Sequence, residues 1–328
     1  MIRFIIVRLL TGLLVVFLVS VATFLMFFAA PNDVARTMAG KAATPETIAL
    51  INHRLGLDQP LWHQYGHFIW RALHGDLGYD YYHQRSVVSI IKKAAPVSLS
   101  IAFGAAILWM ILGVGSGIIS AVRPRSIMDR TLNVIALIFY SMPTFVLGSM
   151  LLFFLYFKLT SAGHSWFPAA GYVPWFGKPD PSNPEHGFWP WMHHLILPWV
   201  TLALVTAAAY TRFTRGSMLE VLSEDYIRTA RAKGISERRV VFRHALRSAL
   251  TPVVTQFGID LAILAGGTVV TEQLFGMHGL GWNSLTAITN QDLPVIVGIL
   301  LVVSVFVVVA NFIVDLVYAV LDPRVRLY

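Results

Sequence analysis

The sequence contains no cysteine, so it can form neither a disulfide nor a metal site built on thiolates. Charged residues are scarce as well: they make up 13% of the chain, against 56% hydrophobic residues. This balance is typical of an integral membrane protein and unlike that of a soluble domain. A Gly-x-x-x-x-Gly-Lys-Ser/Thr phosphate loop is also missing. The chain by itself is therefore not expected to bind and hydrolyse ATP.

Signatures of membrane-bound enzymes are missing too. The sequence has no His-Glu-x-x-His, no Gly-x-Ser-x-Gly and no pair of acids inside an apolar run. The formal net charge of +8 could indicate a nucleic-acid partner. However, the basic residues cluster between apolar runs, where the excess of Lys and Arg in cytoplasmic loops accounts for them. No nucleic-acid partner is expected.

Apolar runs dominate what is present, and they predict an all-α, polytopic membrane protein. A helix rises 1.5 Å per residue and the hydrocarbon core is roughly 30 Å thick, so about 20 residues span it. Six transmembrane helices are predicted, the fourth of them short, at residues 5–30, 99–122, 132–157, 195–210, 253–270 and 295–321. Gly113, Gly115 and Gly117 permit close contact of the second helix. Met142-Pro143 is expected to kink the third, because proline removes a backbone donor.

The first apolar run has a second interpretation. Ala29-Ala30 could form the cleavage site of a signal peptide. The run is longer than the usual apolar core of a signal peptide, which favours a retained anchor.

The distribution of arginine predicts that both termini are cytoplasmic. Arginine is dense in the short segments that would lie inside, namely Arg3, Arg8, Arg123, Arg125, Arg130, Arg212, Arg215, Arg324 and Arg326. A long external loop then follows the first helix. We expect residues 1–94 to form an anchor and external loop, and residues 95–328 to form the transmembrane core. Asp315 lies near the inner surface, where structural pairing is expected.

A basic, amphipathic stretch, residues 224–252, separates two apolar runs. Gly234 suits the position just past a helix end, where φ is often positive, and Ile235 can fold back onto that helix. Ser236 is a good N-cap for a second helix. With the residues before it, the stretch forms a cytoplasmic hairpin of about residues 211–252, called the basic hairpin below. The simpler alternative is a solvated basic loop that sets orientation or touches anionic lipid.

Histidines are frequent in the first external segment. His63 and His67 are spaced i, i+4, and His53, His74 and His83 lie nearby. A metal site is one interpretation, but no third ligand stands at a diagnostic spacing. Surface or packing histidines are favoured, and no metal site is predicted.

Several motifs resemble those of ATP-binding-cassette importer permeases, and more narrowly the dipeptide, oligopeptide and nickel permease family. The basic hairpin resembles their cytoplasmic EAA loop through Asp-Tyr-Ile-Arg-Thr-Ala-Arg-Ala-Lys-Gly at residues 225–234. Further matching motifs lie at residues 56–60, 74–78, 243–247, 271–275, 279–281 and 322–326, and at Pro252. Arg228-Thr229-Ala230 departs from the general Glu-Ala-Ala pattern but fits the peptide and nickel branch.

The resemblance implies the type I importer permease fold and the first, "B"-type, permease of a pair. It implies a bacterial inner or plasma membrane protein that forms half of a peptide translocation pore. The implied partners are a second homologous permease, two ATPase subunits or domains, an extracytoplasmic solute-binding protein, a peptide substrate and the lipid bilayer. ATP and magnesium would be bound by the ATPases, so no cofactor is expected in this chain and no catalytic residue is assigned.

Two groups of site residues follow from this resemblance. The family's EAA loop docks into an ATPase, which assigns that coupling role to Glu224, Arg228, Ala230, Arg231, Ala232, Gly234 and Ile235. Ala230, Ala232, Gly234 and Ile235 are expected to form the buried contact with the ATPase, with Arg228 and Arg231 at its rim. Asp260 lies within the fifth apolar run, where an ionisable group usually faces protein or a water-filled path. We assign Asp260 and Glu272 to the possible pore or substrate path, while for Asp260 a hydrogen bond to a neighbouring helix remains the alternative.

Other functions remain open at this point. The substrate could be nickel or another small solute of the same family. From a different class, the chain could be an ion-coupled secondary carrier or a channel, which would need no docking hairpin. Export is disfavoured because no ATPase domain is present in the sequence.

Overall fold

The computed structural model describes residues 2–28, 44–46, 48–49, 53, 58–80, 82–176, 187–265 and 268–321. These residues are almost entirely helical, and within them the only β pairing is an isolated bridge between Tyr79 and Ser86. The helices are α1 (Ile2–Phe28), α4 (Leu61–Leu73), α5 (Val87–Val122), α6 (Ile127–Ser141), α7 (Thr144–Leu151), α8 (Leu159–Ser161), α9 (Phe188–Leu222), α10 (Asp225–Ala232), α11 (Glu237–Arg239), α12 (Leu246–Ala265), α13 (Val269–Leu274), α14 (Leu280–Asn290) and α15 (Leu293–Leu321), with π-helices η1 (Leu152–Lys158) and η2 (Val240–Ala245).

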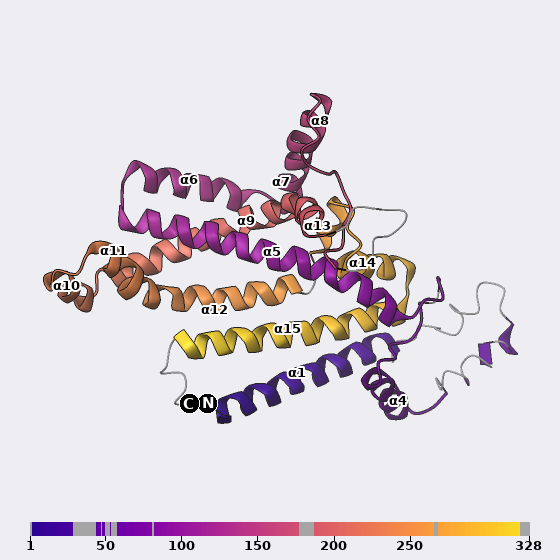
Figure 1. The fold of residues 1–328 in the computed structure, drawn as a ribbon. Helices are drawn as coiled ribbons and strands as arrows, with labels where there is room; N and C mark the ends of the chain where they lie inside the picture. The colour runs from indigo at the N-terminus through magenta and orange to yellow at the C-terminus, as the bar shows by residue number, and fades with distance from the viewer. Residues whose placement is uncertain are drawn as a thin grey trace.

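Five long helices, α1, α5, α9, α12 and α15, run roughly along one direction and form a bundle (Figure 1). The pair α5 and α9 has the most extensive contact. Two of the three glycines of α5 make this contact close. A Cβ at Gly113 would lie 2.4 Å from Tyr210 Cβ, and one at Gly117 would lie 2.6 Å from Thr214 Cβ, whereas Gly115 has no such neighbour among the described residues. The predicted role of small residues is therefore confirmed for Gly113 and Gly117.

Five helical segments are long and apolar enough to cross a membrane within the described part of the chain: Ile5–Leu25, Val87–Val122, Thr144–Ser161, Phe188–Leu222 and Leu293–Leu316. The fifth predicted span corresponds to α12, which is not among these five. Its 20 residues include the polar side chains of Arg247, Gln256 and Asp260. It nevertheless packs against α15 and α9 within the bundle.

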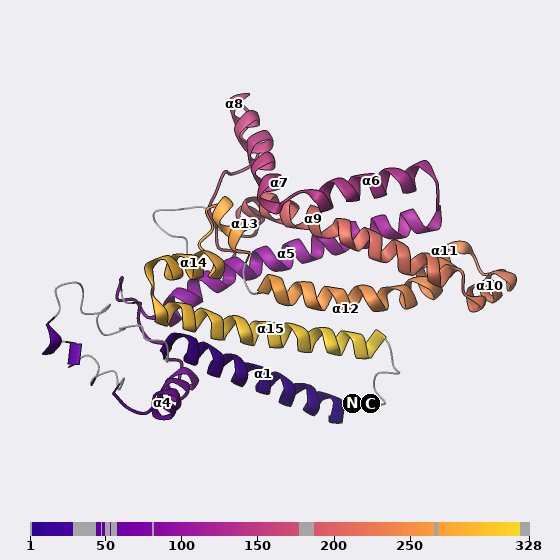
Figure 2. The ribbon, with the colours of Figure 1, turned by 180° about the vertical axis from the view of Figure 1, so that it is seen from behind.

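The third predicted span is wrong as a single kinked helix. Helix α6 ends at Ser141, and α7 begins at Thr144. Met142 and Pro143 both have extended backbone, with ψ of 127° and 137°. The chain changes direction at this point, and the arm formed by α7, η1 and α8 rises away from the bundle in both views (Figures 1 and 2). Two consecutive extended residues redirect a helix, whereas proline alone would only bend it.

Two predicted helices are longer in the structure than their apolar runs. Helix α5 begins at Val87, so the predicted division at residues 94 and 95 falls inside one continuous helix. Helix α9 continues to Leu222, so the basic hairpin is shorter than predicted and consists of residues 223–245. The apolar run marks the lipid-facing part of a helix, but the backbone hydrogen bonds continue past it into polar sequence.

The basic hairpin lies at one end of the bundle, and α4, α13 and α14 lie at the other (Figure 1). The start of α1 and the end of α15 are side by side, joined by an ion pair of 3.1 Å between Arg8 Nε and Asp315 Oδ2. This contact confirms the predicted pairing of Asp315. Ala29-Ala30, Gly266-Gly267 and the motifs at residues 56–57 and 322–326 lie outside the described residues.

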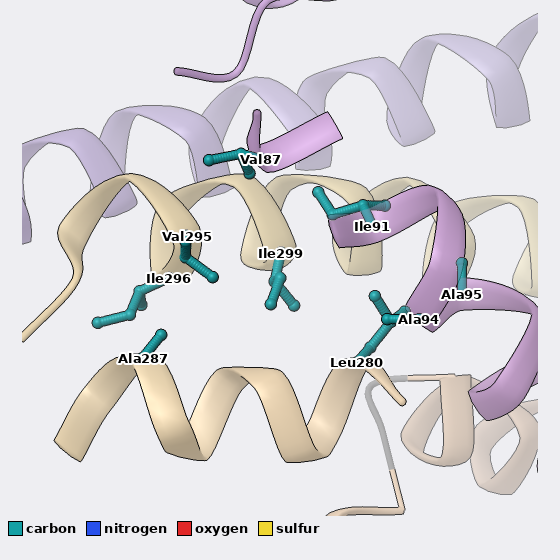
Figure 3. Close-up of a cluster of buried hydrophobic side chains, with 9 residues drawn as sticks. All are labelled: Val87, Ile91, Ala94, Ala95, Leu280, Ala287, Val295, Ile296 and Ile299. Atoms are coloured by element: carbon teal, nitrogen blue, oxygen red, sulfur yellow. The ribbon is translucent and has the colours of Figure 1, made fainter. Parts of the chain in front are cut away.

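At the end opposite the basic hairpin, α14 is held by an apolar core. Figure 3 shows side chains of α5, α14 and α15 that converge there, including Val87, Ile91, Leu280, Val295 and Ile299. All five are less than 10% exposed. This core fixes α14 against the starts of α5 and α15.

Candidate functional site

The turn of the basic hairpin has the geometry that the sequence predicted. Gly234 has a φ of +73°, in the left-handed region that favours glycine. Its N–H donates to the carbonyl of Arg231 at 2.9 Å, and the N–H of Ile235 donates to the carbonyl of Ala230 at 3.3 Å. These two bonds are those of a Schellman motif, which ends a helix and satisfies its last carbonyls. The predicted helix–turn–helix is confirmed. Ser236 stands at the N-cap position of α11, but its side chain makes no capping hydrogen bond to the described residues.

One face of the basic hairpin is packed against the rest of the chain. Ile227 and Ala230 of α10 are 0% and 7% exposed. They belong to one apolar cluster with Met218 of α9 and Val240 of η2, and Ile235 packs against this cluster. The hairpin is therefore fixed to the ends of α5, α9 and α12, and a movement of α10 would be transmitted to these helices.

The other face of the basic hairpin is open. Glu224, Arg228, Arg231, Ala232 and Gly234 are all exposed. Ala230 is buried in the apolar cluster of the chain itself, and Ile235, which is partly exposed, packs against that cluster. The exposed side of α10 and the Gly234 turn form the part of the hairpin that another protein could contact.

Two of the predicted arginines are already paired within the hairpin. Arg231 donates to Glu237 with both Nε and Nη2, at 3.1 and 2.7 Å, and so joins α10 to α11 across the turn. The hydrogen bond from Arg231 lowers the pKa of the Glu237 carboxyl. Arg228 reaches Asp225 at 3.1 Å in a fully exposed i, i+3 pair, which contributes little stability.

A buried ion pair lies at the same end of the bundle. Arg215 of α9 donates to Asp129 of α6 with Nε at 2.7 Å and with Nη2 at 2.9 Å. Asp129 is 3% exposed, and it also accepts hydrogen bonds from Ser120, from the Asn133 side chain and from the backbone N–H of Arg125. The hydrogen bond from Arg215, together with that from Ser120, holds the pKa of the Asp129 carboxyl well below its usual range. This network joins the end of α5, the start of α6 and the last third of α9.

Sequence reasoning did not identify Asp129. It assigned Arg215 only to the charge bias that sets orientation. One signal was present: Asp129 is the single acid in a short inner loop that also holds Arg123, Arg125 and Arg130. A lone carboxylate among arginines indicates a pairing site, but its partner lies 86 positions away and cannot be found from local spacing.

Glu272, assigned by sequence to the possible substrate path, is fully buried with 0% exposure. Its Oε1 accepts a hydrogen bond from Ser98 Oγ of α5 at 2.6 Å, and its Oε2 accepts one from the N–H of Trp282 in the first turn of α14 at 2.7 Å. Burial raises the pKa of this carboxyl, while the hydrogen bonds from Ser98 and Trp282 act in the opposite direction. A carboxylate at a helix N-terminus satisfies unpaired N–H groups there and is stabilised by the helix dipole. Glu272 thus holds α5, α13 and α14 together.

Gly279→Ala tests this junction. A Cβ at Gly279 would lie 2.5 Å from both Glu272 Cδ and Ser98 Oγ, and both of these groups are buried. We expect a loss of about 1–3 kcal/mol in stability, because the surrounding side chains must move off their rotamers. The measurement is the thermal midpoint of the purified protein in detergent. Gly115→Ala is the control: no described atom lies within 4 Å of its Cβ, so the midpoint should not fall. Equal midpoints for the two variants would contradict this description.

Asp260 is part of a hydrogen-bonded contact between two helices. Tyr210 Oη of α9 donates to Asp260 Oδ2 at 2.7 Å, and Gln256 Nε2, one turn earlier in α12, donates to Oδ1 at 2.9 Å. Tyr210 is 0% exposed and packs on Trp109 of α5, whereas Asp260 is partly exposed. The carboxyl is thus tied to a neighbouring helix and retains an open side.

No group of three or more His, Asp or Glu side chains that could hold a metal ion occurs among the described residues. The rings of His63 and His67 lie 5.4 Å apart between centroids in a tilted arrangement, on exposed positions of α4. His83 pairs with Asp80 at 2.7 Å. These three histidines therefore contact neighbouring side chains through ring packing and pairing.

Two family models match the chain. Residues 113–327 match the binding-protein-dependent transport system inner membrane component. Residues 1–102 match the model for the N-terminal part of such a membrane component. Together they include the basic hairpin, the Asp129–Arg215 pair and the Glu272 junction.

Curated relatives resemble the chain over nearly its whole length. It is 38% identical over 319 residues to a probable peptide ABC transporter permease protein of Sinorhizobium fredii, with 97% of each chain covered. It is 38% identical over 326 residues to the glutathione transport system permease protein GsiC of Escherichia coli, with 99% of each chain covered.

Solved structures of the MetNI methionine ABC transporter in inward-facing conformations have the same fold. Two crystal forms match at TM-scores of 0.52 and 0.54 and 20% sequence identity, covering 71% of this chain and 96% of the solved one. The predicted all-helical importer permease fold is therefore confirmed.

Proposed function

Since this chain belongs to the family of binding-protein-dependent transport system inner membrane components, we propose that it forms half of the translocation pore of an ATP-driven importer of short peptides. Membership makes it a multi-pass inner-membrane permease that works with ATPase and binding-protein partners, and the ATP is bound and hydrolysed by those ATPases. The finer parts of the proposal are the substrate, the second permease subunit, the orientation and the residue roles.

The relatives support a peptide substrate. One is described as a probable peptide permease and the other as a permease for glutathione, which is itself a short peptide. Both cover nearly the whole chain, so the similarity is not confined to a shared module. Nickel or another small solute remains the alternative within the family, whereas family membership argues against an ion-coupled carrier or a channel.

The observation that carries the proposal is the basic hairpin. Its inner face is buried against the ends of α5, α9 and α12, and its outer face is exposed, small and basic at the Gly234 turn. Such a segment suits rigid-body transmission, because a partner that moves α10 also moves the helices packed against it. We assign docking on an ATPase to Arg228, Ala232, Gly234 and the Arg231–Glu237 pair, and we assign the connection to the bundle to Ala230 and Ile235.

The same arrangement supports cytoplasmic termini. The first turns of α1 and the last turns of α15 lie toward the end of the bundle that carries the basic hairpin (Figure 1). A hairpin that docks on an ATPase must be cytoplasmic, so both chain ends would then be cytoplasmic as well.

The two acids assigned to the substrate path have different roles in this proposal. Asp260 keeps an open side while it is held by Tyr210 and Gln256, so it suits a pore-lining position that contacts the amino group of a peptide. Glu272 is enclosed and joins three helices at the outer end. We therefore assign Glu272 to the support of the helices at the outer end of the bundle and not to direct contact with substrate.

An affinity purification from the native membrane tests the assembly. The chain is tagged, extracted in a mild detergent and analysed by mass spectrometry. We expect a second permease, one or two ATPases and a solute-binding protein, and peptide binding to the purified solute-binding protein would then establish the substrate class. Recovery without any ATPase would contradict the proposal, and a solute-binding protein that binds nickel complexes but no peptide would overturn the substrate assignment.

A further inference from the structure

A cavity of about 550 Å³ separates α1 and α4 from α5 and α15. This volume lies within the range of about 300–1,000 Å³ that ligand sites occupy. Its walls are almost entirely apolar, with Leu13 and Phe17 of α1 facing Leu301 and Val305 of α15. Three polar side chains line it: Ser20 of α1, Tyr65 of α4 and Lys92 of α5. The cavity lies apart from the basic hairpin and from Asp260.

Contacts at both ends keep α1 in place around the cavity. Near one end, Arg8 pairs with Asp315, and a Cβ at Gly12 would lie 2.7 Å from Val308 Cγ1. Near the other end, Ser20 Oγ and Tyr65 Oη are 2.8 Å apart, and Phe24 packs edge-on against the Tyr65 ring. Between these contacts the side chains of α1, α4, α5 and α15 line the space without filling it.

The depth of the cavity matches one leaflet of a bilayer. Leu301 and Phe306 follow the start of α15 by 8 and 13 positions, which places them about 12–20 Å along the helix at 1.5 Å per residue. Half of a hydrocarbon core is roughly 15 Å thick. The cavity, which begins near the end that carries α4 and α14, is therefore about as long as the acyl-chain region of one leaflet.

Lys92 places a positive charge at the end of the cavity that lies near the start of α5. Lys92 is five positions after the start of α5, about 7.5 Å along that helix, and it is exposed. No ion pair joins Lys92 to a carboxylate in the part of the chain that the structure describes. Lys92 can therefore accept an anionic group from outside the protein.

Helix α4 has the features of a helix that lies in the membrane interface. Trp62 and Trp70 are 73% and 64% exposed, and Arg71 is in the last turn. Exposed tryptophans are typical of the interfacial region, where an apolar ring and a polar N–H are both accommodated. Helix α4 is thus placed at the level of lipid headgroups, beside the mouth of the cavity.

We propose that this cavity is a phospholipid site of the leaflet opposite the basic hairpin, with the lipid phosphate at Lys92 and an acyl chain between α1 and α15. The bound acyl chain would fill the cavity and pack against the side of α1 that lines it. An apolar cavity of one leaflet's depth, with a lone cation at its headgroup end, matches the chemistry of a phospholipid. A helix of a partner protein would fill the apolar part but would leave the lysine at the mouth without a counter-charge.

The test uses a phosphatidylglycerol that carries a diazirine near the end of one acyl chain. The full-length protein is reconstituted with this probe in vesicles of phosphatidylethanolamine and phosphatidylglycerol, irradiated and digested, and the labelled peptides are mapped. We expect labels concentrated at residues 13–20 and 301–306. An electrostatic contact near a membrane surface is worth about a fivefold change in binding per lysine, so Lys92→Gln should lower this labelling about fivefold.

Matched variants decide between a site and general contact with lipid. Lys93→Gln is the control for charge, because Lys93 is adjacent and exposed but does not line the cavity. Val305→Trp should fill the cavity and suppress the labels, whereas Val309→Trp, one turn further along α15 and similarly exposed, should not. Equal effects of Lys92→Gln and Lys93→Gln, labels spread evenly along the exposed face of α1, or no labels at the cavity would each overturn the proposal, the last leaving a protein segment as the occupant.

Discussion

Asp129→Ala is expected to destabilise the protein by about 3 kcal/mol or more. Removing one partner of a buried ion pair leaves an uncompensated charge, which typically costs about 3–5 kcal/mol. Here the remaining charge is Arg215, whose side chain is 29% exposed, so the lower end of that range applies. The substitution also removes the carboxyl oxygens that Ser120, Asn133 and the N–H of Arg125 donate to. The start of α6 would lose its attachment to α5 and α9.

Thermal unfolding in detergent measures this effect. A loss of about 3 kcal/mol corresponds to a fall of roughly 4 °C in the midpoint for a chain of 328 residues. The control is Asp76→Ala, which removes a similar pair between Arg71 and Asp76 at 2.9 Å whose side chains are about half exposed. An exposed pair contributes less than about 1 kcal/mol. If the two variants lowered the midpoint equally, the buried Asp129–Arg215 pair would contribute no more stability than the exposed Arg71–Asp76 pair, which would contradict this prediction.

A double variant separates the pair from its surroundings. Asp129→Asn combined with Arg215→Met removes both charges and replaces the guanidinium by an apolar chain of similar length. Replacing a whole buried pair is often neutral or stabilising. We therefore expect the double variant to be more stable than Asp129→Asn alone. A double variant less stable than the single one would show that Arg215 contributes chiefly through contacts other than Asp129.

Gly234→Val is expected to reduce ATP-driven uptake at least tenfold while the protein still reaches the membrane. Gly234 has a φ of +73°, and a β-branched residue in this region is unfavourable by about 1–2 kcal/mol. No described atom lies within 4 Å of a Cβ at this position, so the chain itself has room for the side chain. The strain and the added bulk would both act at the exposed turn that we assign to the ATPase contact.

Uptake of labelled peptide into proteoliposomes that contain the assembled complex and ATP is the measurement. Gly163→Val is the matched control, since Gly163 has a φ of +86°, no described atom within 4 Å of its Cβ, and a place beside α8, away from the hairpin. Gly234→Asn is the second comparison, because asparagine tolerates the left-handed region. Its uptake should exceed that of Gly234→Val. Normal uptake with Gly234→Val would exclude the coupling role of this turn, and equal losses at Gly163 and Gly234 would point to backbone strain alone.

Local features were predictable because their causes lie within a few residues. The Schellman motif needs only a glycine just after a helix and an apolar residue directly following that glycine. Gly234 and Ile235 fill these two adjacent positions. The apolar runs likewise determine which segments become long helices. Their ends were less predictable, as the early start of α5 and the late end of α9 show. Hydropathy reports contact with lipid, whereas a helix ends where its backbone hydrogen bonds end.

Contacts between distant residues were not predictable from one sequence. Ser98 and Glu272 are 174 positions apart, and Asp129 and Arg215 are 86 positions apart. No local pattern relates such partners, because only the packing of α5 against α13 and of α6 against α9 brings them together. The same holds for Ala230, whose place in a motif suggested a partner contact, while its burial depends on Met218 and Val240 from neighbouring elements.

The sequence by itself determined that this is a helical membrane protein with a basic hairpin between two apolar runs, since composition, length and turn chemistry are local properties. Only the tertiary structure decided which face of that hairpin is free, where the chain turns at Met142 and Pro143, and that Glu272 is enclosed. It also created the cavity beside Lys92. These features depend on which helices pack together. Packing brings together side chains that are far apart in the sequence, so it cannot be deduced from local patterns of residues.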